Sequence, residues 1–223
     1  MNQLLVRRLG LLDYQDSYQA MSALTSQRDA SSCDEIWFLQ HPPVYTLGLS
    51  GRREHILDAG EIPVIESDRG GQVTYHGPGQ LVIYLLMDLK RRGLGIKEFV
   101  YRLEQGVIDV LEHRQVPAGR REGAPGVYVK QEKIAALGVR VRRSCTYHGL
   151  ALNVDMDLAP FRGINPCGYP NLGVTQLSEH CPNHNLEQVS VELLDSLLKN
   201  FYPDGCTMSE KHSLNDIYAD TAA

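Results

Sequence analysis

The 223-residue sequence contains no apolar run that approaches the roughly 18 residues of a membrane-spanning helix. Its first eight residues include two arginines and lack the apolar core of a cleavable signal peptide. No stretch rich in serine, glycine and proline separates two domains. We therefore expect one cytoplasmic domain over residues 1–205, followed by a loosely held, polar C-terminal tail over residues 206–223.

An excess of positive charge is also missing. Lysine and arginine number 22 against 27 aspartate and glutamate residues, so the formal net charge of −5 argues against bulk binding of nucleic acid. Three local groups of arginines stand out against this balance: Arg52 with Arg53, Arg120 with Arg121, and Arg140 with Arg142 and Arg143. Each group is either a solvated surface or a contact for an acidic partner.

The five cysteines form an odd, scattered set without a Cys-x-x-Cys pair, which is typical of reduced thiols. The run at 180–184 holds two histidines and a cysteine, but no second ligand pair lies at a spacing that zinc sites use. We expect neither a metal site nor a cofactor.

Apolar periodicity predicts three helices, over residues 13–28, 96–114 and 186–200. Short apolar or alternating runs predict strands over residues 35–39, 44–48, 62–66, 81–87, 126–130 and 133–139. The strand at 62–66 contains a proline and is expected at an edge. Strands in runs, with few helices and no regular alternation, favour a mixed α/β (α+β) fold around a largely antiparallel sheet.

Two segments have backbones that ordinary strands or helices would not use. Residues 69–80 contain four glycines and a proline, so the backbone there must approach something closely. Residues 163–170 place Cys167 on a rigid loop between Pro166 and Gly168. A thiol in this setting is either a nucleophile or a small apolar filler.

A nucleophilic cysteine needs a basic or cationic neighbour, because an ordinary thiol with a pKa of about 8.5 is mostly protonated near neutrality. Three candidates have small flanking residues: His76, His148 and Lys133. Histidine is the usual partner of cysteine, but Lys133 opens a strand of small residues that resembles the wall of a slot. A lysine buried there would have a lowered pKa and could exchange protons with a thiol. The alternatives are two structural histidines and a surface lysine.

Three motifs together resemble the octanoyltransferases of lipoate biosynthesis, the lipoyl(octanoyl) transferase family. They are Arg-Gly-Gly-Gln-Val-Thr-Tyr-His-Gly-Pro-Gly-Gln at 69–80, Lys-Ile-Ala-Ala-Leu-Gly-Val at 133–139 and Gly-Ile-Asn-Pro-Cys-Gly at 163–168. The segment His-Pro-Pro-Val-Tyr-Thr-Leu-Gly at 41–48 agrees as well, and the resemblance covers about residues 5–200. It implies the fold of the catalytic domain of biotin and lipoate protein ligases.

The resemblance also implies roles for individual residues. Cys167 becomes an acyl thioester, and Lys133 is its acid/base partner. The substrate-binding residues that it implies are Arg69, Gly70, Gly71, Gln72, Val73, Thr74, Tyr75, His76, Ala136, Leu137, Gly138, Gly149, Leu150 and Ala151. Glycines 70, 71, 77 and 138 would let the backbone line an apolar slot for the acyl chain, and backbone N–H groups near the cysteine would hold the oxyanion.

The implied reaction transfers an octanoyl group from octanoyl-acyl carrier protein to a lysine of a lipoyl domain. The acceptors are apo lipoyl domains of 2-oxoacid dehydrogenase complexes and the glycine cleavage H protein. No cofactor, nucleic acid or membrane takes part, and we expect a monomer. The alternatives are an ATP-dependent lipoate or biotin ligase, a non-catalytic module that binds carrier or lipoyl domains, and a cysteine thioesterase.

Overall fold

The computed structural model describes residues 2–170 and 172–219, which form an eight-stranded sheet and a smaller three-stranded one. The order of the large sheet is β11-β1-β2-β6-β10-β9-β8-β7. Every pairing from β2 to β7 is antiparallel, whereas β1 runs parallel to both of its neighbours. The expected mixed, largely antiparallel sheet is confirmed. Its strands are β1 Gln3–Leu11, β2 Asp34–Gln40, β6 Gln80–Leu86, β7 Ala118–Gly119, β8 Val127–Val129, β9 Glu132–Arg142, β10 Cys145–Asn153 and β11 Thr207–Lys211.

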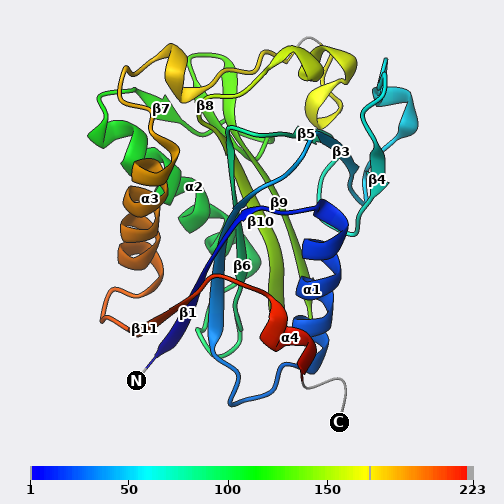
Figure 1. Cartoon of the computed structure of the whole chain (residues 1–223). Helices are drawn as coiled ribbons and strands as arrows, with labels where there is room; N and C mark the ends of the chain where they lie inside the picture. The colour runs from blue at the N-terminus through cyan, green and yellow to red at the C-terminus, as the bar shows by residue number, and fades with distance from the viewer. Residues whose placement is uncertain (1, 171, 220–223) are drawn as a thin grey trace.

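The central strands of this sheet are buried on both faces, as Figure 1 shows. Helices α2 (Ile96–His113) and α3 (Leu186–Phe201) cover one face, and α1 (Tyr14–Gln27) covers the other. Successive side chains of a strand point to opposite faces, so Ile36 and Phe38 pack in the cluster with α2 and α3 while Trp37 packs beside α1. Each such burial contributes about 1.5–3 kcal/mol.

The predicted helices are confirmed to within two residues at each end. Asp13 caps α1 by accepting a hydrogen bond from the backbone N–H of Gln15, and Asn185 caps α3 by accepting one from Gln188. These side chains satisfy N–H groups that a helix start leaves without partners. Within the described part of the chain, no helix has both the length and the hydropathy to cross a bilayer.

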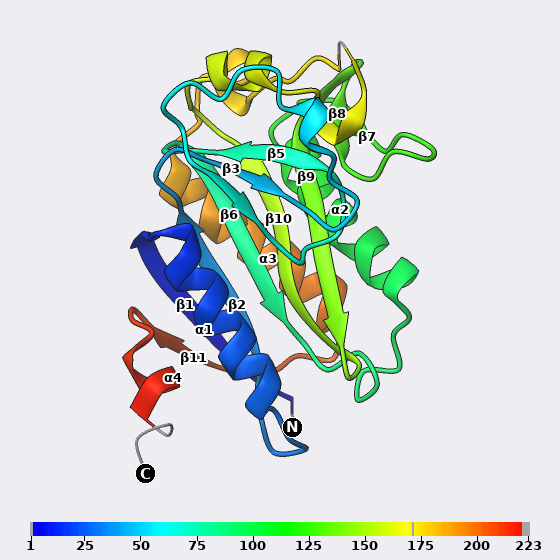
Figure 2. The ribbon, with the colours of Figure 1, turned by 90° about the vertical axis from the view of Figure 1, so that its right-hand side faces the viewer.

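The smaller sheet has the order β4-β3-β5, formed by Val64–Glu66, Val44–Leu47 and Val73–His76. It lies on the α1 side of the large sheet, near its upper end in Figures 1 and 2. β4 is at its edge, as predicted. Tyr45, Tyr75 and Phe161 form the centre of its hydrophobic cluster. Loops around this sheet bring residues 69–72 and 163–169 together at the large sheet.

The segments at the two ends of the chain contradict expectation. β1 was not predicted at all, and the tail predicted to be loosely held forms β11, which pairs with β1, and helix α4 (Asn215–Ala219). Buried Arg7 explains both errors. Its guanidinium, 1% exposed, pairs with Glu35 and Asp216, each at 2.7 Å. The arginine that breaks the apolar pattern of β1 thus ties the C-terminal segment to the sheet.

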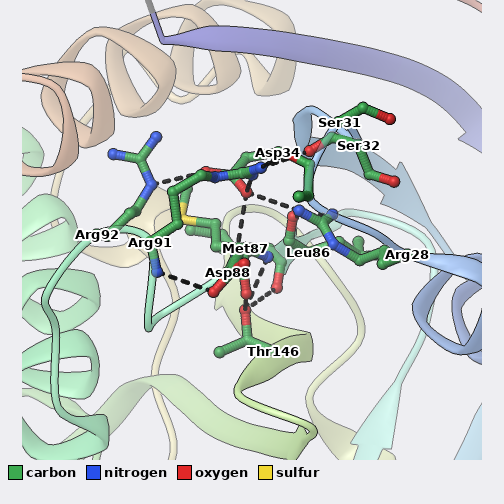
Figure 3. A network of polar contacts seen from close by, with 12 residues as sticks. Arg28, Ser31, Ser32, Asp34, Leu86, Met87, Asp88, Arg91, Arg92 and Thr146 are labelled. Atoms are coloured by element: carbon green, nitrogen blue, oxygen red, sulfur yellow. Dashed lines mark hydrogen bonds and ion pairs between the residues drawn. The ribbon is translucent and has the colours of Figure 1, made fainter.

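A second buried ion network surrounds Asp34 at the start of β2 (Figure 3). Its carboxylate accepts hydrogen bonds from Arg28, Arg91 and Arg92, at 2.7, 2.6 and 2.7 Å. It also accepts one from the backbone N–H of Asp88 at 3.0 Å. Removing one partner of a buried pair leaves an uncompensated charge. The network therefore fixes the segment that leads from β6 to α2.

Candidate active site

Cys167 lies in a short 3-10 turn, η3 (Pro166–Gly168), with the left-handed backbone φ of 56°. Side chains other than glycine adopt this region at a cost. The turn is held by a hydrogen bond from Gly168 N to Asn165 O at 2.9 Å and by another from Asn165 N to His55 O at 2.8 Å. The loop therefore presents the thiol in one orientation, as its proline and glycine predict.

Lys133 reaches the thiol from β9. Its Nζ lies 2.9 Å from Cys167 Sγ and donates a second hydrogen bond to Pro125 O at 3.0 Å. The lysine is 4% exposed. Burial lowers its pKa, but the attraction and hydrogen bond of Cys167 outweigh burial, so the pKa of Lys133 is raised overall. The expectation of a lowered pKa is wrong, because it considered burial without the contact that Cys167 makes with the ammonium.

Arg69 places a second buried cation at the site. It is 7% exposed, and its guanidinium donates to Thr46 Oγ1, Thr46 O, Gly70 O and Gln72 O at 2.6–2.9 Å. Among the described residues no carboxylate pairs with it. Burial lowers the pKa of Arg69, whereas nearby Cys167 raises it. A guanidinium without a counterion adds positive potential, which favours a thiolate.

A narrow cavity of about 40 Å³ lies on the inner side of Cys167, between the two sheets. Most of the predicted substrate-binding residues line it, and it adds Tyr14, Val82, Tyr84 and His148 to that set. The predicted residues in its wall are Arg69, Gly71, Gln72, Val73, Thr74, His76, Ala136, Leu137, Gly138, Gly149, Leu150 and Ala151. The structure thus brings three distant segments of the sequence to one apolar slot.

Three predicted residues do not line this slot. Gly70 lines a second, wider cavity on the other side of Cys167 instead. Tyr75 packs in the hydrophobic cluster of the small sheet, against Tyr45 and Phe161. Gly77 lines neither of the two cavities that contain Cys167, and a Cβ there would meet the ring of Tyr75. In a strand, neighbouring side chains point to opposite faces. Tyr75 therefore points away from the slot while Thr74 and His76 line it.

The close approaches predicted for glycines are present. A Cβ on Gly149 would lie 2.1 Å from Ile83 O, on the neighbouring strand β6. A Cβ on Gly138 would lie 2.9 Å from Gly70 O. Both distances are far inside van der Waals contact, so any side chain would push the small sheet or β6 away from the slot.

The two candidate histidines hydrogen bond elsewhere. His76 Nδ1 lies 2.7 Å from Gln80 Oε1, and His148 Nε2 lies 3.0 Å from Asp68 Oδ1. Burial lowers the pKa of His76 to about 3, and burial also lowers the pKa of His148 in spite of Asp68. Neither shares a hydrogen bond with Cys167 in the described part of the chain. Both line the slot as neutral side chains.

A wider cavity of about 310 Å³ lies on the outer side of Cys167. The two cavities share Gly71, Gln72, Leu137 and Gly138 as well as the cysteine. Two of its other walls, α2 and the segment before β8, were not selected by sequence reasoning: they contribute Ile96, Val100, Gly123, Ala124 and Pro125. Tyr169 of the cysteine loop also lines it. Lys133 lines only this outer cavity. Cys167 thus lies at the junction of a narrow apolar slot and an open vestibule.

Known proteins are similar to this chain in sequence over most of its length. An octanoyltransferase of Thiobacillus denitrificans is 58% identical over 199 residues, covering 89% of this chain and 91% of the relative. An octanoyltransferase of Vibrio cholerae serotype O1 is 54% identical over 197 residues, with 88% and 91% covered. The family model for the lipoyl protein ligase A/B catalytic domain matches residues 13–198.

Solved structures show the same fold at low identity. Protein Ta0514 of T. acidophilum with bound lipoic acid superposes with a TM-score of 0.77 at 14% identity, covering 99% of this chain and 94% of that one. A biotin protein ligase from Aquifex aeolicus gives a TM-score of 0.52 at 12% identity, covering 90% and 68%. The expected ligase-like fold is confirmed. The chain belongs to the lipoyl protein ligase A/B catalytic domain family and, within it, to the octanoyltransferases.

Proposed function

We propose that this chain transfers an octanoyl group from octanoyl-acyl carrier protein to a lysine of apo lipoyl domains, including the glycine cleavage H protein. The observation that best supports this proposal is the 2.9 Å contact between Lys133 Nζ and Cys167 Sγ, at the junction of the slot and the vestibule. The octanoyl tail occupies the slot, and both exchanging groups enter through the vestibule. The protein acts as a cytoplasmic monomer.

In the first half-reaction the Cys167 thiolate attacks the carbonyl carbon of the donor thioester. The tetrahedral intermediate then expels the thiolate of the carrier, which takes a proton from the Lys133 ammonium. One thioester replaces another, so the free energies of reactant and product are nearly equal. The products are acylated Cys167, neutral Lys133 and the free thiol of the carrier.

In the second half-reaction the amine of the acceptor lysine attacks the Cys167 thioester. Neutral Lys133 accepts a proton from the attacking nitrogen, and the intermediate collapses to an amide as the Cys167 thiolate leaves. The ammonium–thiolate pair is thereby restored. Conversion of a thioester to an amide is downhill, which makes the transfer to the acceptor the committed step. Because the two groups are in contact, their titrations belong to the pair.

Intact-protein mass spectrometry tests this proposal. Incubation with octanoyl-acyl carrier protein should add one octanoyl mass to the parent protein and none to Cys167→Ala. Adding an apo lipoyl domain should then discharge the adduct and move the same mass to the acceptor lysine. An adduct that persists in Cys167→Ala would contradict the assignment of the nucleophile. Octanoylation that needs ATP and free octanoate would instead indicate a ligase. Transfer of the octanoyl group from the protein to water would indicate a thioesterase.

A further inference from the structure

The vestibule continues beyond the catalytic pair as an open groove. A further cavity of about 510 Å³ shares Gly70, Ile96 and Val139 with it. The groove therefore runs along β9 from Cys167 toward the far end of that strand. Three of the large hydrophobic side chains that the protein exposes line it: Leu49, Ile96 and Tyr169, at 58%, 43% and 47% exposure.

Positive charge collects at the far end of this groove. Lys90 and Arg140 line this further cavity, and exposed Arg142 and Arg143 follow at the end of β9, where Arg142 Nη1 lies 3.5 Å from Ser26 Oγ of α1. We call these four residues the basic rim. No residue of the rim forms an ion pair with any described carboxylate. Arg140 also has a buried Nε without a hydrogen-bond partner.

The other arginine groups are at least partly neutralised. Arg53 pairs with Glu66 at 2.7 Å, Arg52 with Glu54 at 3.4 Å and Arg120 with Glu104 at 3.0 Å. Opposite charges in contact cancel most of the potential that a partner would meet at a distance. Of the three groups, only the one at 140–143 keeps its full charge and stands on a groove that leads to the nucleophile.

The Asp34 network explains how the rim is held. Asp34 binds Arg91 and Arg92 and fixes the backbone at Asp88, so the charges of these two arginines are paired with a buried carboxylate. Lys90 lies between Asp88 and Arg91 in the sequence, and its side chain is exposed. The loop after β6 thus places Lys90, which forms no ion pair with a described residue, in the same cavity wall as Arg140.

The length of the groove indicates which substrate uses it. Arg142 lies four positions along β9 from Gly138, which is beside Cys167, and this is about 13 Å of strand. A lysine acceptor has only a four-carbon stem, so it cannot reach from this end to the thioester. A flexible, largely uncharged arm on a carrier protein can, and apolar walls suit such an arm.

We propose that the basic rim docks the acidic surface of the acyl-carrying protein, whose arm lies in the groove and presents the thioester to Cys167. The proposal rests on the proposed octanoyl transfer. Charge pairs at the edge of an interface mainly raise the association rate and weaken with salt. The rim should therefore determine the apparent affinity for the carrier-bound donor and leave the chemical step unchanged.

The test compares Arg142→Glu/Arg143→Glu with the control Arg52→Glu/Arg53→Glu. The rate of Cys167 acylation is followed by intact mass against octanoyl-acyl carrier protein and against octanoyl-pantetheine, the arm alone. The rim variant should raise KM for the carrier on the order of tenfold with kcat unchanged, and should lose the parental salt dependence. Acylation by the arm alone, and every parameter of the control, should stay at parental values. Lys90→Glu should act in the same direction.

Three results would overturn the docking assignment. The rim and control variants could have equal KM values for the carrier. The rim variant could lose activity equally with octanoyl-pantetheine, which would locate the damage in the site. Discharge of the pre-formed acyl-enzyme to a lipoyl domain could be slowed as much as acylation, which would make the surface one for the acceptor. Failure of parental protein to be acylated by either donor would instead refute octanoyl transfer itself.

Discussion

Replacing Lys133 by methionine removes the cation from Cys167 while keeping an unbranched side chain of similar length. At the observed 2.9 Å, two unit charges attract by about 6 kcal/mol at an effective dielectric constant of 20. The cost of desolvating both groups offsets most of this attraction, and we take about 2 kcal/mol as the net preference for the charged pair. That preference corresponds to a roughly 30-fold smaller thiolate population in the variant.

The proton transfers are lost as well. General acid–base catalysis contributes about 10²–10⁴-fold, so octanoyl transfer should fall by about 10³-fold or more in Lys133→Met. Lys133→Arg separates the two roles, because its guanidinium stays charged and does not give up a proton. It should keep most of the thiolate and still fail to complete transfer to the acceptor amine.

Alkylation by iodoacetamide measures the thiolate directly. The rate at Cys167 is followed by peptide mass near neutral pH, with Cys167→Ala giving the background from the other four thiols. We expect slow alkylation in Lys133→Met and nearly parental alkylation in Lys133→Arg. Parental rates of alkylation and acylation in Lys133→Met would refute the role of this pair.

Three further predictions concern stability and the C-terminal segment. Burial lowers the pKa of His41 to about 4 and of His76 to about 3, whereas unfolded histidine protonates near 6.5. The free energy of unfolding should therefore decrease as the pH drops below 6.5, by up to about 1.4 kcal/mol per pH unit for each histidine. An unchanged urea midpoint between about pH 7 and about pH 5 would contradict this. Gly149→Ala should lose about 2 kcal/mol or more by urea unfolding, while Gly119→Ala, with open space around its Cα, serves as the control. Asp216→Asn should speed hydrogen exchange of the amides in β11 without affecting those of β6, because buried Arg7 loses the one of its two carboxylate partners that lies in the C-terminal segment. Equal protection would show that the ion pair does not hold the strand.

Local signals in the sequence were enough to predict the helices and the close backbone approaches at the site. The apolar stripes of α2 and α3, the capping residues Asp13 and Asn185, and the glycines that allow close approach all act over a few residues. The pairing of Lys133 with Cys167 is different, because the two are 34 positions apart. Composition and spacing left three candidate partners for the thiol, and only the family resemblance selected one.

Long-range pairing caused the errors. β1 carries Arg7 inside the sheet, and its partners lie 28 and 209 positions away, so in the sequence this arginine only interrupts an apolar run. The same pairing makes a strand and a helix of residues that look like a loose tail. The sign of the pKa shift at Lys133 also depended on a distance to an anion, which a sequence does not contain. The vestibule was missed because its walls come from ordinary apolar residues of a helix.

The left-handed backbone at Cys167 has a consequence for how the protein can evolve. A non-glycine residue in this conformation costs about 1–2 kcal/mol, and asparagine or glycine would occupy it with less strain. Under the proposed mechanism, position 167 is one where selection for activity opposes selection for stability. A lineage that lost the need for acyl transfer would gain stability by its first substitution there, and would keep the fold while losing the enzyme.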